Sequence, residues 1–416
     1  MDPGAYEFYL RGRDYLRQPR DTLALQNAAE MFTKAVTISP DYSDAFAGLC
    51  DTLLQQYSAD RGKDRFTAAE QACQRAQTLD NSSFAAYIAL GNLYLVSGQY
   101  ALAKREYNRA LSLKPTAVDA HLGLAELFKA EGKYPLAEQT LKSAIELEPN
   151  NWAASMAMGR HLFDVGRIEE SLRYFERINE LTPESNAAAN NLGSAYFLLG
   201  RFEEAAAAWE AALRGEPMAS LYANLGSSYF FMGRYEEAAQ IYQKALELAP
   251  ESFEIWGNLA DAQKAFAAQT GVTGADSTAT VTAHSIETGN TYEKAILLAK
   301  QHLQINPSDA LAIASLGHYF ACVGNQKDAM ANINLAVQMA DKDMMVYYYS
   351  ATALCALGEE ERAFEAVQIG LSLGYPAHMV DADAGLSCLK QVPAYKAIMA
   401  EQSHRTTTVA EKESNQ

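Results

Sequence analysis

One stretch of fifteen residues is written almost identically twice in this chain. Residues 191–205 read NLGSAYFLLGRFEEA, and residues 224–238, which begin 33 positions later, read NLGSSYFFMGRYEEA, so eleven of fifteen positions agree. A period of this size is the signature of a repeat architecture, in which each short unit buries its apolar face only by stacking on its neighbours. The repeat therefore constrains the fold more strongly than length or composition does.

A 34-residue pattern extends this repeat in both directions. Apolar residues at positions 4, 7, 8 and 11 predict one face of a first helix, and those at 20, 24 and 27 predict one face of a second. Glycine at position 15 suits the left-handed residue that ends a helix, and proline at position 32 stops the next one. These markers recur as Gly98, Gly132, Gly166, Gly200 and Gly233, and as Pro115, Pro149, Pro183, Pro217 and Pro250.

This pattern resembles the tetratricopeptide repeat, with a highly specific match over residues 84–252 and a clear one over 5–399. The resemblance implies an all-α fold, a right-handed superhelical solenoid of stacked helix hairpins. We expect about ten hairpins and a C-terminal capping segment. The predicted organisation is two divergent repeats in 1–82, a regular array in 83–263, a low-complexity inserted loop in 264–291, further repeats in 292–377, capping helices in 378–399 and a disordered tail in 400–416.

Several segments are similar, more narrowly, to the C-terminal repeat array of bacterial signalling proteins. They include AYEFYLRGRDYL near the start, WGNLADA from residue 256, and GLSLGYPAHMVDADAGLSCLKQVPAYKAIM from residue 370. In that family the array follows a serine/threonine kinase, an adenylate cyclase or a winged-helix domain. The resemblance implies that a kinase or cyclase domain could stand upstream, and that the array could lie outside the cytoplasm.

The charge balance argues against a nucleic-acid partner. The chain has 34 basic and 51 acidic residues and a net charge of −17, with no extended basic cluster to neutralise phosphates. No run of eighteen apolar residues occurs, and the N-terminus lacks the basic start and apolar core of a signal peptide. We therefore expect no direct membrane insertion and, for the chain as written, a cytoplasmic location.

One catalytic motif occurs in the chain, and its placement argues against catalysis. Residues 370–374 spell GxSxG, but Ser372 falls at the end of a predicted second helix, where no strand can present it as a nucleophile. No phosphate-binding loop, HExxH pair or zinc-like Cys/His spacing occurs, and His121 holds an apolar repeat position. We therefore predict no catalytic residues, no metal and no cofactor.

The five cysteines lack any CxxC pair. Cys50, Cys73, Cys322, Cys355 and Cys388 fall mostly within apolar helical patterns, which favours small buried residues with inert thiols. A disulfide between Cys50 and Cys73 remains an alternative in an oxidising compartment.

Stacked hairpins present their first helices on a concave surface, and the side chains at positions 2, 5, 6, 9 and 12 are expected to face it. Two short ladders occupy these positions. Position 6 carries Asn191, Asn224 and Asn258, whose carboxamides can pair with the backbone of an extended peptide. Position 12 carries Phe163, Phe197 and Phe230, and Arg160, Asn190, Ser194 and Ser227 lie between the ladders. Ordinary scaffold roles for both ladders remain open.

These observations predict a non-enzymatic scaffold that binds a protein or an extended peptide in its groove. The acidic groove positions Asp119, Glu126, Glu254 and Asp261 favour a positively charged partner. Two alternatives stay open: a detached sensory or regulatory array of a bacterial kinase or cyclase protein, and a self-assembling structural protein.

Overall fold

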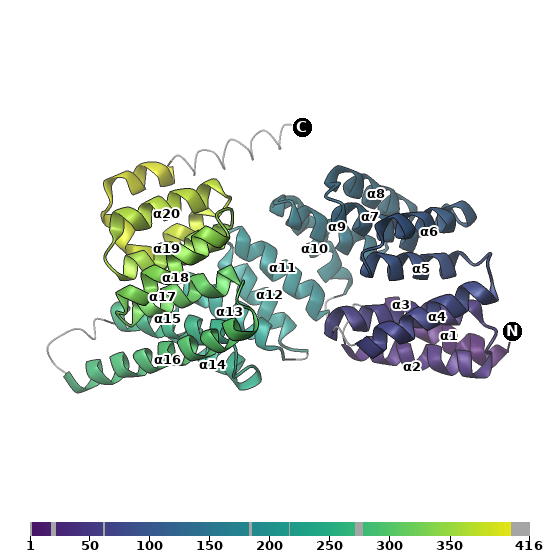
Figure 1. The fold of residues 1–416 in the computed structure, drawn as a ribbon, viewed down its shortest axis with the longest axis horizontal. Helices are drawn as coiled ribbons and strands as arrows, with labels where there is room; N and C mark the ends of the chain where they lie inside the picture. The colour runs from purple at the N-terminus through teal and green to yellow at the C-terminus, as the bar shows by residue number, and fades with distance from the viewer. Residues whose placement is uncertain are drawn as a thin grey trace. The chain divides into compact units, whose positions relative to one another are not determined.

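The computed structural model describes residues 2–17, 22–60, 63–182, 185–215, 217–270 and 278–400. Within these ranges the fold is all-α, without strands, and twenty consecutive helices form ten hairpins followed by a C-terminal cap (Figure 1). The first five hairpins are α1 (Pro3–Arg17) and α2 (Thr22–Ile38), α3 (Ser43–Asp60) and α4 (Lys63–Leu79), α5 (Phe84–Val96) and α6 (Tyr100–Leu113), α7 (Val118–Ala130) and α8 (Tyr134–Leu147), and α9 (Trp152–Asp164) and α10 (Ile168–Leu181).

The remaining five hairpins follow in the same order. They are α11 (Asn186–Leu198) and α12 (Phe202–Ala212), α13 (Ala219–Phe231) and α14 (Tyr235–Leu248), α15 (Phe253–Gln269) and α16 (Thr278–Ile305), α17 (Ala310–Cys322) and α18 (Gln326–Met339), and α19 (Met344–Ala356) and α20 (Glu360–Ser372). The expected number of hairpins is therefore confirmed for the described part of the chain.

The chain divides into two compact units, Met1–Ala195 and Tyr196–Gln416. The division falls within α11 and therefore inside the region predicted as one regular array. Each unit has its own contacts between successive hairpins, such as α3 with α5 in the first and α17 with α19 in the second. The two units are described separately below.

The glycines that end the first helices have the conformation that the pattern predicts. Gly98 has a φ of 75° and Gly233 a φ of 73°, and both lie in the left-handed region that favours glycine. The amide of the next residue, Gln99 or Arg234, then donates to a carbonyl in the last turn of the finished helix, that of Tyr94 or Tyr229. This turn reverses the chain and starts the second helix.

Close packing within a hairpin depends on small residues facing an aromatic ring. Tyr107 of α6 is fully buried between Gly91 of α5 and Gly123 of α7. A Cβ atom on Gly123 would lie 2.3 Å from Cε1 of that ring, well inside van der Waals contact. The tyrosine therefore packs its own hairpin against the next one.

The cap folds back onto the second unit. It consists of α21 (Ala377–Ala382), the short 3₁₀ helix η1 (Ala384–Gln391) and a helical stretch at 393–400. Leu386 and Leu389 of η1 are buried in the core cluster of the unit, and η1 contacts α15, α19 and α20. These residues bury the apolar surface that the last hairpin would otherwise expose.

The predicted loop over 264–291 is wrong for most of its length. Helix α15 continues to Gln269 and α16 begins at Thr278, so only residues 271–277 of that range fall outside the description. The buried side chains of Tyr292, Ala295 and Ala299 hold the later part of α16 against the core. Because a formed helix adds a hydrogen bond with each residue, it extends backward into a segment that lacks an apolar period.

The predicted disordered tail also lies largely beyond this description, which ends at residue 400. Within the described part of the chain, no helix combines the length and the apolar character needed to cross a bilayer.

Candidate functional site

The predicted groove residues divide between the two units. In the first unit, Asn191 is half-buried on α11, and its Nδ2 donates to Sδ of Met156 on α9 at 3.2 Å. Asn190 and Ser194 are also half-buried, and Ser194 donates to the Asn190 carbonyl. Arg160 is exposed. One member of the asparagine ladder thus bridges the first helices of two consecutive hairpins.

The second unit holds the other predicted groove residues. Asn224 and Asn258 are half-buried at equivalent places on α13 and α15. Ser227 donates to the Ala223 carbonyl and lies 3.0 Å from the Tyr242 hydroxyl, so its oxygen is tied to the hairpin. The asparagines are therefore the ladder members of this unit that combine polar groups with partial exposure.

The phenylalanine ladder does not form a row of open pockets. Phe230 is buried, with its ring against Phe231 and Tyr235. Phe197 packs on Phe202, Trp209 and Phe231, and Phe163 of the first unit packs on Phe175. Phe163 and Phe197 are half-buried, so each ring contacts its aromatic neighbours and keeps part of its surface exposed.

A second set of polar residues meets on the first helices of the C-terminal unit. Asp261 of α15 and His318 of α17 both hold position 9 of their repeats, and Cys322 follows one turn after His318. The distance from His318 Nε2 to Asp261 Oδ1 is 2.9 Å, and that from His318 Nε2 to Cys322 Sγ is 3.7 Å. We call these three residues the acid–imidazole–thiol cluster. Its ligand atoms all lie within 4.8 Å of one another.

Two further side chains complete the surroundings of the cluster. Tyr292 of α16 donates its hydroxyl proton to Asp261 Oδ1 at 2.5 Å. Lys264, one turn after Asp261, places its Nζ atom 3.5 Å from Cys322 Sγ and is otherwise exposed. The cluster and these two neighbours together bring two acidic groups, two basic groups and one hydroxyl donor into contact.

The positive charge of His318 and the negative charges of Asp261 and Cys322 stabilise each other. Burial by itself would lower the pKa of His318, but the Cys322 thiolate and the Asp261 carboxylate raise it well above the usual range. Burial would raise the pKa values of Asp261 and Cys322, yet the His318 imidazolium lowers both. The thiol is therefore predisposed to ionise.

A buried carboxyl group lies in the cap beside this region. Asp383 is 2% exposed, and it accepts hydrogen bonds from the Tyr348 hydroxyl at 2.7 Å and from the Gly385 amide at 2.7 Å. Burial nevertheless raises its pKa to about 6. Asp383 thus caps η1 while remaining able to titrate near neutral pH.

Sequence reasoning missed the acid–imidazole–thiol cluster because it searched for closely spaced metal motifs. Asp261 is 57 residues from His318, and only the stacking of α15 on α17 brings them together. One local signal was available, since His318 and Cys322 are four residues apart on one helix and therefore share a face.

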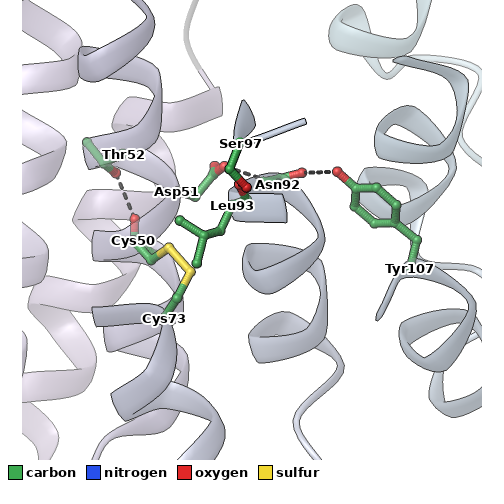
Figure 2. The surroundings of a disulfide bond; sticks show 9 residues. Cys50, Asp51, Thr52, Cys73, Asn92, Leu93, Ser97 and Tyr107 are labelled. Carbon is green, nitrogen blue, oxygen red and sulfur yellow. Dashed lines mark hydrogen bonds between the residues drawn. A yellow bond between two sulfur atoms is a disulfide. The ribbon is translucent and has the colours of Figure 1, made fainter. Parts of the chain in front are cut away.

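The structure joins four cysteines in two disulfides. Cys50 of α3 pairs with Cys73 of α4, and Cys355 of α19 pairs with Cys388 of η1. Figure 2 shows the first bond inside its hairpin, beside Leu93. The interpretation of these four as inert thiols is wrong, because facing helices and the returning cap bring the cysteines of each pair into contact. Cys322 is the free cysteine.

A polar chain runs beside the first disulfide. Asn92 of α5 donates to Asp51 of α3 at 2.8 Å, and the Tyr107 hydroxyl donates to Asn92 Oδ1 at 2.7 Å (Figure 2). An asparagine on a first helix again connects consecutive hairpins.

The two isolated motif residues have ordinary placements. Ser372 is the last residue of α20, where its hydroxyl donates to the Ile369 carbonyl at 2.7 Å. His121 is half-buried, with Nε2 3.2 Å from the Pro115 carbonyl oxygen. Both agree with the helix-end and packing roles predicted from sequence.

Comparison with protein families identifies the repeats. Residues 88–152 and 156–220 match one profile of the tetratricopeptide repeat, and residues 219–252 match another. Residues 88–252 therefore contain tetratricopeptide repeats, and in the structure these residues form consecutive helix hairpins. No curated protein sequence matches the chain.

Three of the solved structures that this chain resembles are the following. A tetratricopeptide repeat protein from Parabacteroides merdae is 20% identical, with 62% of this chain and 98% of that one covered, at a TM-score of 0.39. The pilF protein of Pseudomonas aeruginosa is 19% identical, with 65% of this chain and 98% of that one covered, at a TM-score of 0.39. One chain in the structure of the APC/C hetero-tetramer Cut9–Hcn1 is 17% identical, with 93% of this chain and 76% of that one covered, at a TM-score of 0.43.

Proposed function

We propose that this chain is a non-enzymatic scaffold that binds a protein or an extended peptide along the first helices of its repeats. The observation that carries the proposal is the matched repeat array itself, with half-buried carboxamides recurring on its first helices. Such an array presents a surface far longer than a single hairpin could offer.

The asparagine ladder is the proposed contact with the partner. Each carboxamide offers two donors and two acceptor lone pairs. An extended peptide exposes backbone amide and carbonyl groups, and these can pair with the carboxamides that each unit presents on its first helices. The aromatic side chains at position 12 would then pack beneath this surface and support it.

We also propose that the chain works in an oxidising compartment. Disulfides persist in such compartments and are reduced in most cytosols, and the structure has one in each unit. This favours the extracytoplasmic alternative over the cytoplasmic location expected from the N-terminal sequence. It also keeps open the role of a sensory array attached to a kinase or cyclase.

The scaffold is tested by comparing captured proteins between the parent and the triple variant Asn191→Ala, Asn224→Ala, Asn258→Ala. A matched control replaces three asparagines on second helices, Asn108, Asn179 and Asn332, with alanine. We expect the first variant to lose a partner that the parent and the control both retain, with equal helicity in all three. Identical capture by both variants would refute a role for the ladder.

A self-assembling structural protein would behave differently. Light scattering over a range of concentrations should then show growing oligomers, whereas a scaffold for another protein should keep a constant mass.

A further inference from the structure

We propose that Asp261, His318 and Cys322 form a binding site for one divalent transition-metal ion, with Zn²⁺ the best match to the donor set. The inference does not depend on the partner-binding role proposed above. It rests on the geometry, burial and charge of the acid–imidazole–thiol cluster.

The donor types suit zinc. Carboxylate oxygen, imidazole nitrogen and thiolate sulfur are its usual protein ligands, at bond lengths of about 2.0 to 2.3 Å. In a tetrahedral site these lengths put nitrogen roughly 3.3 Å from oxygen and roughly 3.6 Å from sulfur. The observed separations from His318 Nε2 are 2.9 Å to Asp261 Oδ1 and 3.7 Å to Cys322 Sγ. The third pair, Asp261 Oδ1 and Cys322 Sγ, lies within 4.8 Å, so side-chain shifts of up to about 1 Å would bring all three donor atoms onto one ion.

The scaffold holds these ligands in place. His318 is 5% exposed, and its ring lies 6.3 Å from the ring of Tyr292 and 6.2 Å from that of Tyr349, centroid to centroid. The Tyr292 hydroxyl donates to the Asp261 oxygen that faces His318. Hydrogen bonds of this kind orient metal ligands and are part of a functional site.

The surrounding charges allow a cation. The cluster supplies a carboxylate and a thiolate, which together balance a divalent charge, and the ion takes the place of the His318 Nε2 proton, which is released to solvent. Lys264 is the opposing group, with Nζ 3.5 Å from Cys322 Sγ. Because Lys264 is exposed, its ammonium group can move into solvent when a metal ion replaces it beside the sulfur.

Three protein ligands leave a fourth tetrahedral position. The side chain of Asp261 is 28% exposed and Cys322 is half-buried, so this position opens toward solvent. It would hold a water molecule or a side chain of a bound partner. Structural zinc sites usually have four protein ligands, so the site belongs to the open class.

The test uses the full chain, with its disulfides intact, and two probes, Zn²⁺ alone and Co²⁺ alone. We expect one Zn²⁺ per chain in competition with a coloured chelator. Bound Co²⁺ should give the thiolate charge-transfer band and the strong visible absorption of a tetrahedral site. This spectrum needs no variant, so it does not depend on whether a substituted chain folds.

Variants then assign the ligands. Cys322→Ser should abolish the charge-transfer band and weaken Zn²⁺ binding at least tenfold, and His318→Gln should weaken it similarly. The matched control is His302→Gln, because His302 Nε2 lies 2.8 Å from Asp309 Oδ2 in a similar pair without a cysteine nearby. That variant should keep the parent's affinity and spectrum.

Zn²⁺ should also slow alkylation of Cys322 by iodoacetamide at least tenfold. The proposal is overturned if Co²⁺ gives no thiolate band with the parent. It is also overturned if Zn²⁺ binds the parent, Cys322→Ser and His318→Gln with equal affinity, or if Cys322 of the parent is alkylated at the same rate with and without Zn²⁺.

Discussion

His318 Nε2 lies 2.9 Å from Asp261 Oδ1, and this contact joins the first helices of two consecutive repeats. Both residues hold the same position in their repeats, so the stacking that defines the fold also sets their separation. Tyr292 from the intervening second helix donates to the same oxygen. Three successive helices thus meet at one carboxylate.

The first prediction concerns the state of the five cysteines. Iodoacetamide applied without reductant should label one cysteine per chain, Cys322, because the other four are paired. After reduction in denaturant, all five should react. Mass spectrometry of the intact chain counts the labels, and five labels without reductant would contradict the two disulfides.

The second prediction concerns the stability that the first disulfide gives. Cys50 and Cys73 are 23 residues apart, and a cross-link over such a loop stabilises by about 3 kcal/mol through the entropy of the unfolded chain. Replacing both with alanine should lower the free energy of unfolding of the first unit by roughly that amount. Denaturant unfolding checks this, and treating the parent with reductant should reproduce the loss.

The third prediction tests the packing of Tyr107. Gly123→Ala would place a methyl group 2.3 Å from the ring, so overpacking should cost about 1 to 3 kcal/mol. Gly289→Ala is the control, because a Cβ atom there meets nothing within 4 Å and the residue lies inside α16. Alanine should stabilise that helix by about 0.5 to 1 kcal/mol. The midpoint temperature of thermal unfolding should therefore fall for Gly123→Ala and rise for Gly289→Ala.

The fourth prediction concerns pH. The pKa of Asp383 is about 6 in the folded chain and 3.8 when the carboxyl is exposed to water, so folding favours the protonated carboxyl. Its contribution to stability is fully present below pH 4 and is lost as the pH rises through about 6. The loss amounts to roughly 3 kcal/mol.

Asp383→Asn mimics the protonated carboxyl and should remove this dependence. Relative to the parent, the variant should gain stability between pH 4 and pH 7, as measured by denaturant unfolding at each pH. An unchanged difference between the two proteins over this range would show that Asp383 does not titrate there.

The local pattern was sufficient to predict the hairpins. Glycine at position 15 and the apolar period of each helix specify where the chain turns and which face is buried, and Gly98 and Gly233 have the expected positive φ. The two asparagines predicted at equivalent places on α13 and α15 also lie half-buried there. Both kinds of feature depend on residues a few positions apart.

Contacts between residues far apart in the sequence could not be predicted from the local pattern. Phe230 is buried because the rings of Phe231 and Tyr235 lie against it. The inserted segment became part of α16 because a packed helix extends beyond its apolar period.

The sequence by itself determined an all-helical repeat, since each hairpin is specified by turns and apolar faces within about 34 residues. Only the tertiary structure decided which cysteines pair and which polar groups meet. Cys355 reaches Cys388 through the returning cap, and Asp261 reaches His318 across 57 residues. Stacking brings such residues together because equivalent positions of successive first helices lie side by side, whatever their distance along the chain.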